Sequence, residues 1–171
     1  RVTRELGDEI KEVLKGAQHD GYKIPRRADF LGRWIWHSGW YPGHVLRLFK
    51  RANGKFNDHT VHEGIELNGS VGRLRHDLLH YTDPSIEHYF EKFNRYTSLA
   101  AEALLQKGIQ FRLVDLIIRP PLTFLRMYIA KGGFLDGLQG FMLAVFSSCY
   151  VFAKYAKLWD LYRRGEATDT A

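Results

Sequence analysis

The chain has 171 residues, of which 45% are hydrophobic, and this length suits one ordinary globular domain or part of a larger one. Its formal charge of +6 comes from 25 Lys and Arg residues against 19 Asp and Glu residues, spread along the chain without a run of like charge. This spread argues against a nucleic-acid binder and is compatible with an anionic membrane surface. The single cysteine, Cys149, excludes an intramolecular disulfide and suits a cytoplasmic location.

The N-terminal stretch, residues 2–15, repeats apolar residues at helical spacing and predicts an amphipathic helix. Thr3 is placed to cap this helix and Gly16 to end it. The chain opens at Arg1 without an initiator Met and in the middle of this pattern. We therefore expect a fragment of a longer protein, or a processed chain.

Residues 21–82 contain short apolar or alternating runs separated by Gly, Pro, Asn and Asp, a pattern typical of strands and long loops. The expected strands cover residues 22–25, 45–49, 70–74 and 78–81. Three of the four tryptophans and six of the eight histidines also lie in this part of the chain. Because indole and imidazole rings can both pack against a ligand and form hydrogen bonds with it, their concentration here is the first indication of a functional site.

From residue 83 onward the pattern becomes helical. Asp83 is expected to cap a helix that has Pro84 at its first position and continues to about Gly108. A second helical pattern runs from about residue 110 to 131 and contains the pair Pro120–Pro121, which should kink or split it.

The third helical segment includes residues 137–153, which carry no charged side chain. This run is at the lower limit of length for a membrane-spanning helix, so we favour a helix lying in or against the bilayer interface. A buried core helix is the alternative. Asp136 is expected to cap this helix, rather than to act in catalysis. Residues 165–171 are expected to form a disordered tail.

A series of short motifs occurs in order along the chain. They are YKIPRR (residues 22–27), FLGR (30–33), GWYP (39–42), RLF (47–49), VHE (61–63) and GFLDG (133–137). This ordered set resembles the C-terminal half of family 2 inverting glycosyltransferases of the GT-A type. It is most similar to the bacterial lipopolysaccharide-core enzymes that add a β-linked glucose, and the resemblance covers nearly the whole chain.

The resemblance implies an α+β fold in two parts. Residues 1–82 would form the C-terminal, acceptor-side part of a Rossmann-like GT-A catalytic domain, built from short mixed strands. Residues 83–171 would form a helical, membrane-associated region that holds the protein at the cytoplasmic face of the bacterial inner membrane.

The resemblance implies inverting transfer of a hexose from a nucleotide sugar to a lipid-linked saccharide such as lipopolysaccharide core, and glucose is the expected hexose. In that family an Asp-x-Asp motif that binds a divalent metal, Mg²⁺ or Mn²⁺, lies directly ahead of a segment like residues 1–6. We therefore expect the chain alone to lack donor binding and most metal ligands, and to be inactive. The alternative is a non-catalytic membrane-interface binding module, and nucleic acid is not an expected partner.

An inverting transfer needs a carboxylate that takes the proton of the acceptor hydroxyl. Glu63 matches the acidic position of the family's His-Glu motif and is the expected base, with Asp58 as the competing candidate. His62 would lie beside the donor diphosphate or complete the metal shell. The alternative is that Glu63 pairs with an arginine and His62 is a loop histidine. His59 and His62 alone do not predict a zinc site, because zinc needs three or four ligands.

Arg47 lies between Leu46 and Leu48, so strand alternation should turn its side chain to the opposite face. A guanidinium there suits a phosphate or an acceptor carboxylate, and an arginine on a solvated strand face is the alternative.

Four aromatic residues close together provide flat apolar faces on which sugar rings pack: Trp34, Trp36, Trp40 and Tyr41. Trp34 and Trp36 share a face if their segment is extended. Core packing is the alternative for one or two of the four.

Overall fold

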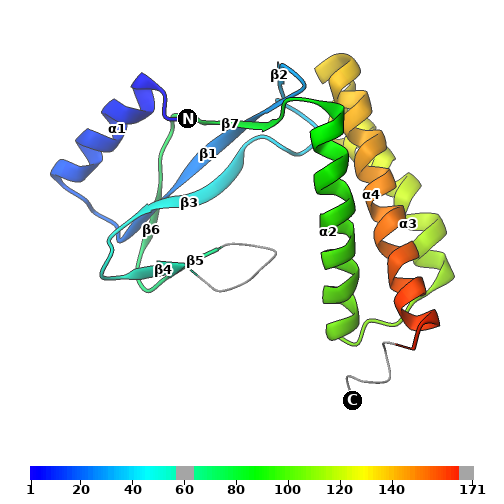
Figure 1. Cartoon of the computed structure of the whole chain (residues 1–171). Coiled ribbons are helices and arrows are strands. Elements are labelled where there is room, and N and C mark those ends of the chain that lie inside the picture. The colour runs from blue at the N-terminus through cyan, green and yellow to red at the C-terminus, as the bar shows by residue number, and fades with distance from the viewer. Residues whose placement is uncertain (57–63, 166–171) are drawn as a thin grey trace. The chain divides into compact units, whose positions relative to one another are not determined.

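The structure is a computed structural model that describes residues 1–56 and 64–165. The chain divides into two compact units, Arg1–Thr82 and Asp83–Ala171 (Figure 1). Strands occur in the first unit and long helices in the second, so the predicted α+β class is confirmed. Residues 166–171, which make up most of the expected tail, lie outside the described residues.

Within residues 1–56 and 64–83, the structure describes one helix and seven strands. In chain order these are α1 (Arg4–Lys15), β1 (Gly21–Phe30), β2 (Arg33–Trp34), β3 (Gly43–Phe49), β4 (Gly54–Phe56), β5 (Ile65–Leu67), β6 (Val71–Arg73) and β7 (Leu78–Asp83). The long strand β1 is the centre of the main sheet (Figure 1). It pairs antiparallel with β2 and β3, parallel with β6, and also with β7, while β4 and β5 form a separate antiparallel pair.

The predicted N-terminal helix and its cap are confirmed. The Oγ1 atom of Thr3 accepts a hydrogen bond from the N–H of Leu6 at 3.1 Å, and Gly16 is the C-cap residue. Leu6 is fully buried and packs with Tyr22, Ile24 and Leu74 in the core of this unit. The apolar face of α1 is thus held against the sheet by the burial of side chains spaced at helical intervals.

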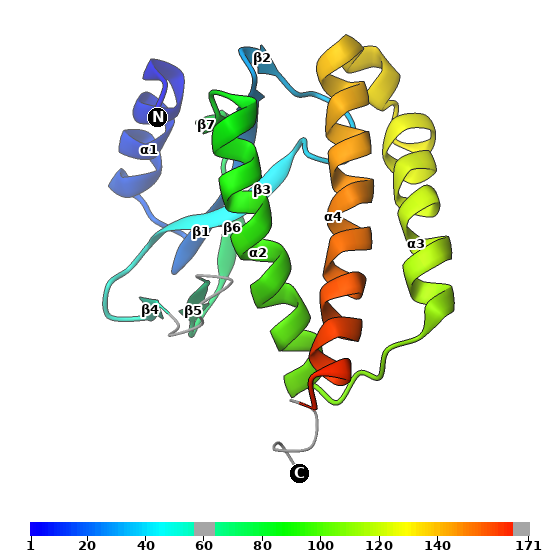
Figure 2. The same ribbon diagram turned by 45° about the vertical axis from the view of Figure 1, so that its right-hand side comes forward.

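The second unit contains three long helices, α2 (Ile86–Gln106), α3 (Leu113–Leu125) and α4 (Gly137–Arg163). A π-helical turn, η1 (Arg126–Ala130), and a 3₁₀ turn, η2 (Gly133–Asp136), join α3 to α4. Helix α4 lies between α2 and α3, and it packs against both of them (Figure 2). The core of this unit combines Ala101 of α2 with Tyr155, Leu158 and Leu161 of α4.

The expected start of the first long helix was wrong by two residues. Helix α2 begins at Ile86, and its cap is Ser85, whose Oγ accepts a hydrogen bond from the N–H of His88 at 3.1 Å. Asp83 instead ends β7 and is buried, with His88 Nδ1 at 3.2 Å and Lys92 Nζ at 2.9 Å from its carboxylate. Its carboxylate is occupied by these two side chains and is not the helix cap.

The proline pair does not split the second helical segment, because α3 continues through Pro120 and Pro121. Each proline lacks the N–H that a helix interior requires. Pro120 is buried, and its carbonyl accepts a hydrogen bond from Ser148 Oγ of α4 at 2.8 Å. We attribute the continuity of the helix to this packing against α4.

The last helix starts where the sequence predicts, but its cap differs. Asp136 occupies the N-cap position and is 1% exposed, yet its side chain makes no capping hydrogen bond. The helical stretch Gly133–Arg163 is the one among the described residues that is long and apolar enough to cross a membrane, by length and composition only.

Candidate functional site

A half-buried arginine lies at the centre of the aromatic part of the first unit. Arg27 belongs to β1, and its Nε is 3.2 Å from Oδ2 of Asp77, which lies just ahead of β7. The other carboxylate oxygen of Asp77 accepts a hydrogen bond from the hydroxyl of Tyr41 at 3.1 Å. Asp77 is 12% exposed, so one largely buried carboxylate holds both side chains in place.

Aromatic rings cover the guanidinium of Arg27. Its Cζ lies 4.6 Å from the ring centroid of Trp36 and 5.5 Å from that of Trp34. These distances are typical of cation–π contacts. Trp36 also packs edge-on against Tyr41 at 4.8 Å, and Trp34 against Tyr81 of β7 at 5.3 Å. We call this group, which consists of Arg27, Trp34, Trp36, Tyr41, Asp77 and Tyr81, the Arg27 cluster.

The local sequence explains how the two tryptophans reach the same arginine. Strands β1 and β2 form a hairpin whose turn residues, Leu31 and Gly32, both have positive φ angles of 51° and 78°. This is the backbone sign required by tight hairpin turns. After the turn the side chains alternate. Ile35 is buried, whereas Trp34 and Trp36 both point toward Arg27, as their spacing predicts.

The cluster combines accessible ring faces with a fixed network of polar groups. Trp36 and Tyr81 are 44% and 58% exposed, so parts of their rings are open to a ligand. Burial raises the pKa of Tyr41 above its ordinary value, and the hydrogen bond and negative charge of Asp77 raise it further. Tyr41 therefore remains a protonated donor at neutral pH. The carboxylate of Asp77 is engaged by Arg27 and Tyr41, which suits a binding surface better than a centre for proton transfer.

The fourth predicted aromatic residue has a different role. Trp40 packs edge-on against Phe30 at 6.1 Å, and Phe30 is fully buried in the sheet. Core packing thus accounts for Trp40, while Trp34, Trp36 and Tyr41 gather around Arg27.

The alternation expected around Arg47 was wrong. The register between β1 and β3 shifts at this point, because Tyr22 pairs with Leu48 and Lys23 pairs with Leu46. Arg47 is therefore the extra residue of a β-bulge, and the two leucines lie on opposite faces of the sheet. Arg47 is exposed on β3, and it lies close enough to Arg26 to act on that residue's pKa. Burial, and then the like charge of Arg47, lower the pKa of Arg26.

The expected catalytic residues Asp58 and Glu63, together with His62 and His59, lie outside the described residues. Strands β4 and β5 flank this segment and pair antiparallel, with Phe56 opposite Ile65. The roles assigned to Asp58, His62 and Glu63 therefore stay predictions.

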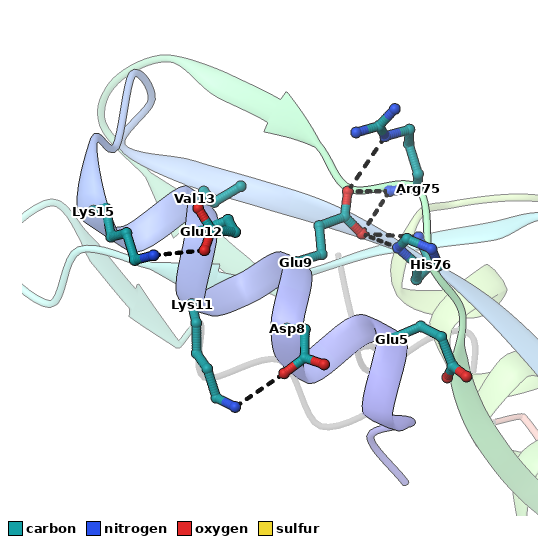
Figure 3. Close-up of a pocket in the computed structure, with 9 residues that line it drawn as sticks. All are labelled: Glu5, Asp8, Glu9, Lys11, Glu12, Val13, Lys15, Arg75 and His76. Carbon is teal, nitrogen blue, oxygen red and sulfur yellow. Dashed lines mark hydrogen bonds and ion pairs between the residues drawn. The ribbon is translucent and has the colours of Figure 1, made fainter.

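A second surface feature is a depression of about 640 Å³ along α1 (Figure 3). At its edge the carboxylate of Glu9 accepts hydrogen bonds from the backbone N–H groups of Arg75 and His76, at 2.9 and 3.0 Å, and lies 2.9 Å from His76 Nδ1. Burial by itself would raise the pKa of Glu9, but these hydrogen bonds outweigh it and lower the pKa. The hydrogen bonds of Glu9 thus link α1 to the segment ahead of β7 and stabilise the fold of this unit.

Metal-ligating side chains do not gather within residues 1–56 and 64–165. No group of three or more His, Cys, Asp and Glu residues in these ranges could hold a metal ion. The described residues thus do not fit the divalent metal that the family resemblance implies.

Sequence reasoning did not single out Arg27, Asp77 and Tyr81. Arg27 was part of the motif YKIPRR, and that motif was the available signal in the sequence. Asp77 and Tyr81 are more than 40 residues from Trp34, so nothing local indicated that they would meet it.

Several curated proteins are similar to this chain. The lipopolysaccharide core biosynthesis glycosyltransferase LpsC of Rhizobium meliloti (strain 1021) is 32% identical over 168 residues, which cover 94% of this chain and 60% of LpsC. An uncharacterized glycosyltransferase of Rickettsia prowazekii (strain Madrid E) is 26% identical over 186 residues, covering 99% of this chain and 62% of the relative. One of Rickettsia typhi (strain ATCC VR-144 / Wilmington) is 25% identical over 176 residues, covering 94% and 59%.

The chain therefore spans about 60% of the length of the curated relatives that it matches. No protein-family model matches the chain, and no solved structure matches it significantly.

Proposed function

We propose that this chain is part of a glycosyltransferase of cell-envelope biosynthesis. The observation that carries the proposal is the 32% identity to a lipopolysaccharide core glycosyltransferase over 94% of this chain. Two more distant relatives are also named glycosyltransferases, and they too align along nearly the whole chain. Because the chain spans about 60% of these relatives, the activity is proposed for the whole protein.

The proposed reaction is inverting transfer of a hexose, with glucose as the first candidate, from a nucleotide sugar to a lipid-linked saccharide. The resemblance to GT-A enzymes of family 2 supports this choice. Glu63 is the proposed general base, which takes the proton from the acceptor hydroxyl as that oxygen attacks the anomeric carbon and the nucleoside diphosphate leaves. Asp58 is the alternative base. His62 is proposed to lie beside the departing diphosphate.

The Arg27 cluster is the proposed acceptor-binding surface. The exposed faces of Trp36 and Tyr81 suit the apolar face of a sugar ring, and the ion pair beneath them keeps the rings in a fixed orientation. Arg47, exposed at its bulge, is the proposed contact for a phosphate or carboxylate of the acceptor.

A divalent metal, Mg²⁺ or Mn²⁺, is proposed to act in the whole enzyme, but the described residues supply no donor set for it. The expectation that the chain alone is inactive also stays a prediction. The proposed location is the cytoplasmic face of the bacterial inner membrane, with the protein peripherally bound.

The proposal is tested in the whole protein with radiolabelled nucleotide hexoses and a lipid-linked saccharide acceptor. Glu63→Gln should lower kcat by about 10²- to 10⁴-fold, which is the usual contribution of a general base, while donor affinity stays unchanged. Glu66→Gln is the matched control, because Glu66 lies on the neighbouring strand β5 and pairs with Lys55 at 3.3 Å.

Each outcome has a defined meaning. Full activity in Glu63→Gln together with loss in Asp58→Asn would move the base to Asp58. Retention of the anomeric configuration in the product, read by NMR, would exclude the inverting mechanism. A wild-type protein that binds vesicles but transfers no hexose would favour the non-catalytic binding module.

A further inference from the structure

Helix α3 turns its most apolar side toward solvent. Six large apolar residues of this helix are between 47% and 63% exposed: Leu113, Val114, Ile117, Ile118, Leu122 and Leu125. Most of them are spaced by three or four residues and so lie along one side of the helix. A helix at the surface of a water-soluble domain normally carries polar residues at these positions. Helix α3 thus exposes apolar residues where a helix of a water-soluble domain exposes polar ones.

The exposed apolar side continues onto α4. The ring of Phe141 contacts Phe124 at 6.0 Å and Tyr128 at 5.6 Å, which joins the two helices at one end. Along α4 a line of apolar residues is exposed, and it consists of Leu138, Phe141, Phe152 and Trp159. Ile129 of η1 is 60% exposed, and Phe134 and Leu135 of η2 are 52% and 55% exposed. We call these residues, with the six of α3, the α3–α4 apolar face.

A row of arginines borders this face. Arg112, Arg119 and Arg126 are spaced seven residues apart, which is close to two helical turns, so they lie almost in line along α3. All three are exposed. With about 100° per residue, this line runs beside the apolar stripe and not within it.

Negative charge near the row is already neutralised. Asp115 pairs with Arg119 at 2.5 Å, and Asp160 pairs with Arg163 and Arg164 at 2.7 Å each. Asp136, the third acidic residue between positions 109 and 164, is 1% exposed. The same range contains eight Lys and Arg residues, so its accessible charge is positive.

We propose that the α3–α4 apolar face lies in the surface of an anionic lipid bilayer, with α3 parallel to the membrane plane and its arginine row at the level of the lipid phosphates. An apolar stripe edged by basic residues is the pattern of helices that bind in this way. Long arginine side chains reach the phosphates while their stems stay beside the acyl chains. Trp159 and Tyr128 suit the same interfacial level.

The proposal rests on the membrane location proposed above and deepens it, because it names the inserting face. From the sequence, the segment that contains residues 137–153 of α4 was expected to lie in or against the bilayer interface. However, Gly140, Leu143 and Ala144 of that run are buried. Part of its apolar character is thus used for internal packing, and α3 supplies six of the thirteen exposed residues of the face, more than any other element.

The test is flotation of the whole protein with vesicles of phosphatidylcholine alone or with 30 mol% phosphatidylglycerol added. We expect binding to the anionic vesicles, weakened by high salt. Replacement of Arg112, Arg119 and Arg126 by Gln should lower the partition coefficient on the order of 100-fold, since each basic residue contributes roughly fivefold near such a surface. Lys at the three positions should restore most of the binding.

The apolar contribution is tested with the double variant Ile118→Ser and Leu122→Ser, which should also detach the protein. Leu14→Ser is the matched control, because Leu14 of α1 is 59% exposed, as Leu122 is 56% exposed, but it lies outside the face. Circular dichroism and thermal melting of each variant establish that folding is retained. A fluorophore on Ile118→Cys in a Cys149→Ser background should shift to the blue on vesicle binding, and one on Leu14→Cys should not.

Three results would overturn the proposal. If the arginine variant and the serine variant both bound anionic vesicles as tightly as the wild type does, the protein would be using another surface. Release only by detergent would indicate a membrane-spanning α4. A concentration-dependent dimer that buries Ile118 and ignores vesicles would assign the face to a second copy of the chain. Hexosyl transfer to a water-soluble acceptor, measured in the same variants, reports on the proposed enzyme activity separately, because it needs no vesicle.

Discussion

Arg27 and Asp77 form an ion pair across the first unit, with Nε of the arginine 3.2 Å from Oδ2 of the aspartate and both side chains mostly buried. The pair links the middle of β1 to the segment ahead of β7. The ion pair fixes the positions of both side chains. Removal of either partner would leave the other charged group poorly compensated in a half-buried site. The aromatic rings around Arg27 are thereby kept in one arrangement.

Trp36→Ala should raise the KM for the saccharide acceptor about 10-fold, because an aromatic contact is worth roughly 0.5–1.5 kcal/mol beyond its buried area. The KM for the nucleotide sugar should not change. Steady-state kinetics of the whole protein with each substrate varied in turn provides the measurement. Trp36→Phe keeps a flat ring over Arg27 and should retain most of the affinity. Equal loss for both substrates would argue against an acceptor-binding role.

Tyr41→Phe should lower the free energy of unfolding by about 1 kcal/mol, since it removes one hydrogen bond to a largely buried carboxylate. Urea unfolding followed by fluorescence measures the change. Tyr81→Phe is the control, because Tyr81 is 58% exposed and the substitution keeps its ring contact with Trp34. If both variants lose the same stability, the hydrogen bond to Asp77 is not the cause.

The sequence was most informative where local rules decide the structure. The helical spacing of residues 2–15, the cap at Thr3 and the strand-like runs between 21 and 82 all correspond to elements of the fold. Errors arose where tertiary contacts compete with local preference. Asp83 binds His88 and Lys92 instead of capping a helix, and packing against α4 keeps α3 continuous through its prolines.

The candidate site was partly predictable for the same reason. Alternation places Trp34 and Trp36 on one face, and that rule needs only neighbouring residues. The bulge at Arg47 depends on how β3 pairs with β1, and the meeting of Arg27 with Asp77 depends on contacts 50 residues apart. Single-sequence patterns carry no information on such long-range pairings.

Asp20→Asn should destabilise the protein at neutral pH, and the effect should fade in acid. Its carboxylate accepts hydrogen bonds from Ser70 N at 2.9 Å and Asn53 Nδ2 at 2.8 Å, and it pairs with Lys50 at 3.2 Å. The bonds from Ser70 and Lys50 lower its pKa from an ordinary value of 3.8 to about 2. Since the folded-state pKa is depressed, the stabilisation is complete above pH 4 and is lost as the pH falls through about 2.

Denaturant unfolding of wild type and Asp20→Asn at several pH values between 2 and 7 tests this dependence. The difference in unfolding free energy should be constant from pH 7 to about pH 5 and should shrink below pH 4. Asp8→Asn serves as the control, because Asp8 is 59% exposed and pairs with Lys11 on the surface of α1. A difference that does not vary with pH would show that ionisation of Asp20 is not responsible.

Gly140→Ala should destabilise the second unit, because the new methyl group would overlap the carbonyl oxygen of Gly133 and lie 2.9 Å from Cβ of Asp136. Overpacking of this kind lowers the free energy of unfolding by about 1–3 kcal/mol. Because the new methyl group meets a backbone carbonyl, the backbone itself must shift to make room for it. Gly7→Ala in α1 is the opposite case. Its added Cβ meets only Val2 Cγ1, at 3.9 Å, so better helix propensity should raise stability by about 0.5–1 kcal/mol. Thermal or urea unfolding of both variants should give shifts of opposite sign, and a neutral Gly140→Ala would mean that the close approach of α4 to η2 is not required.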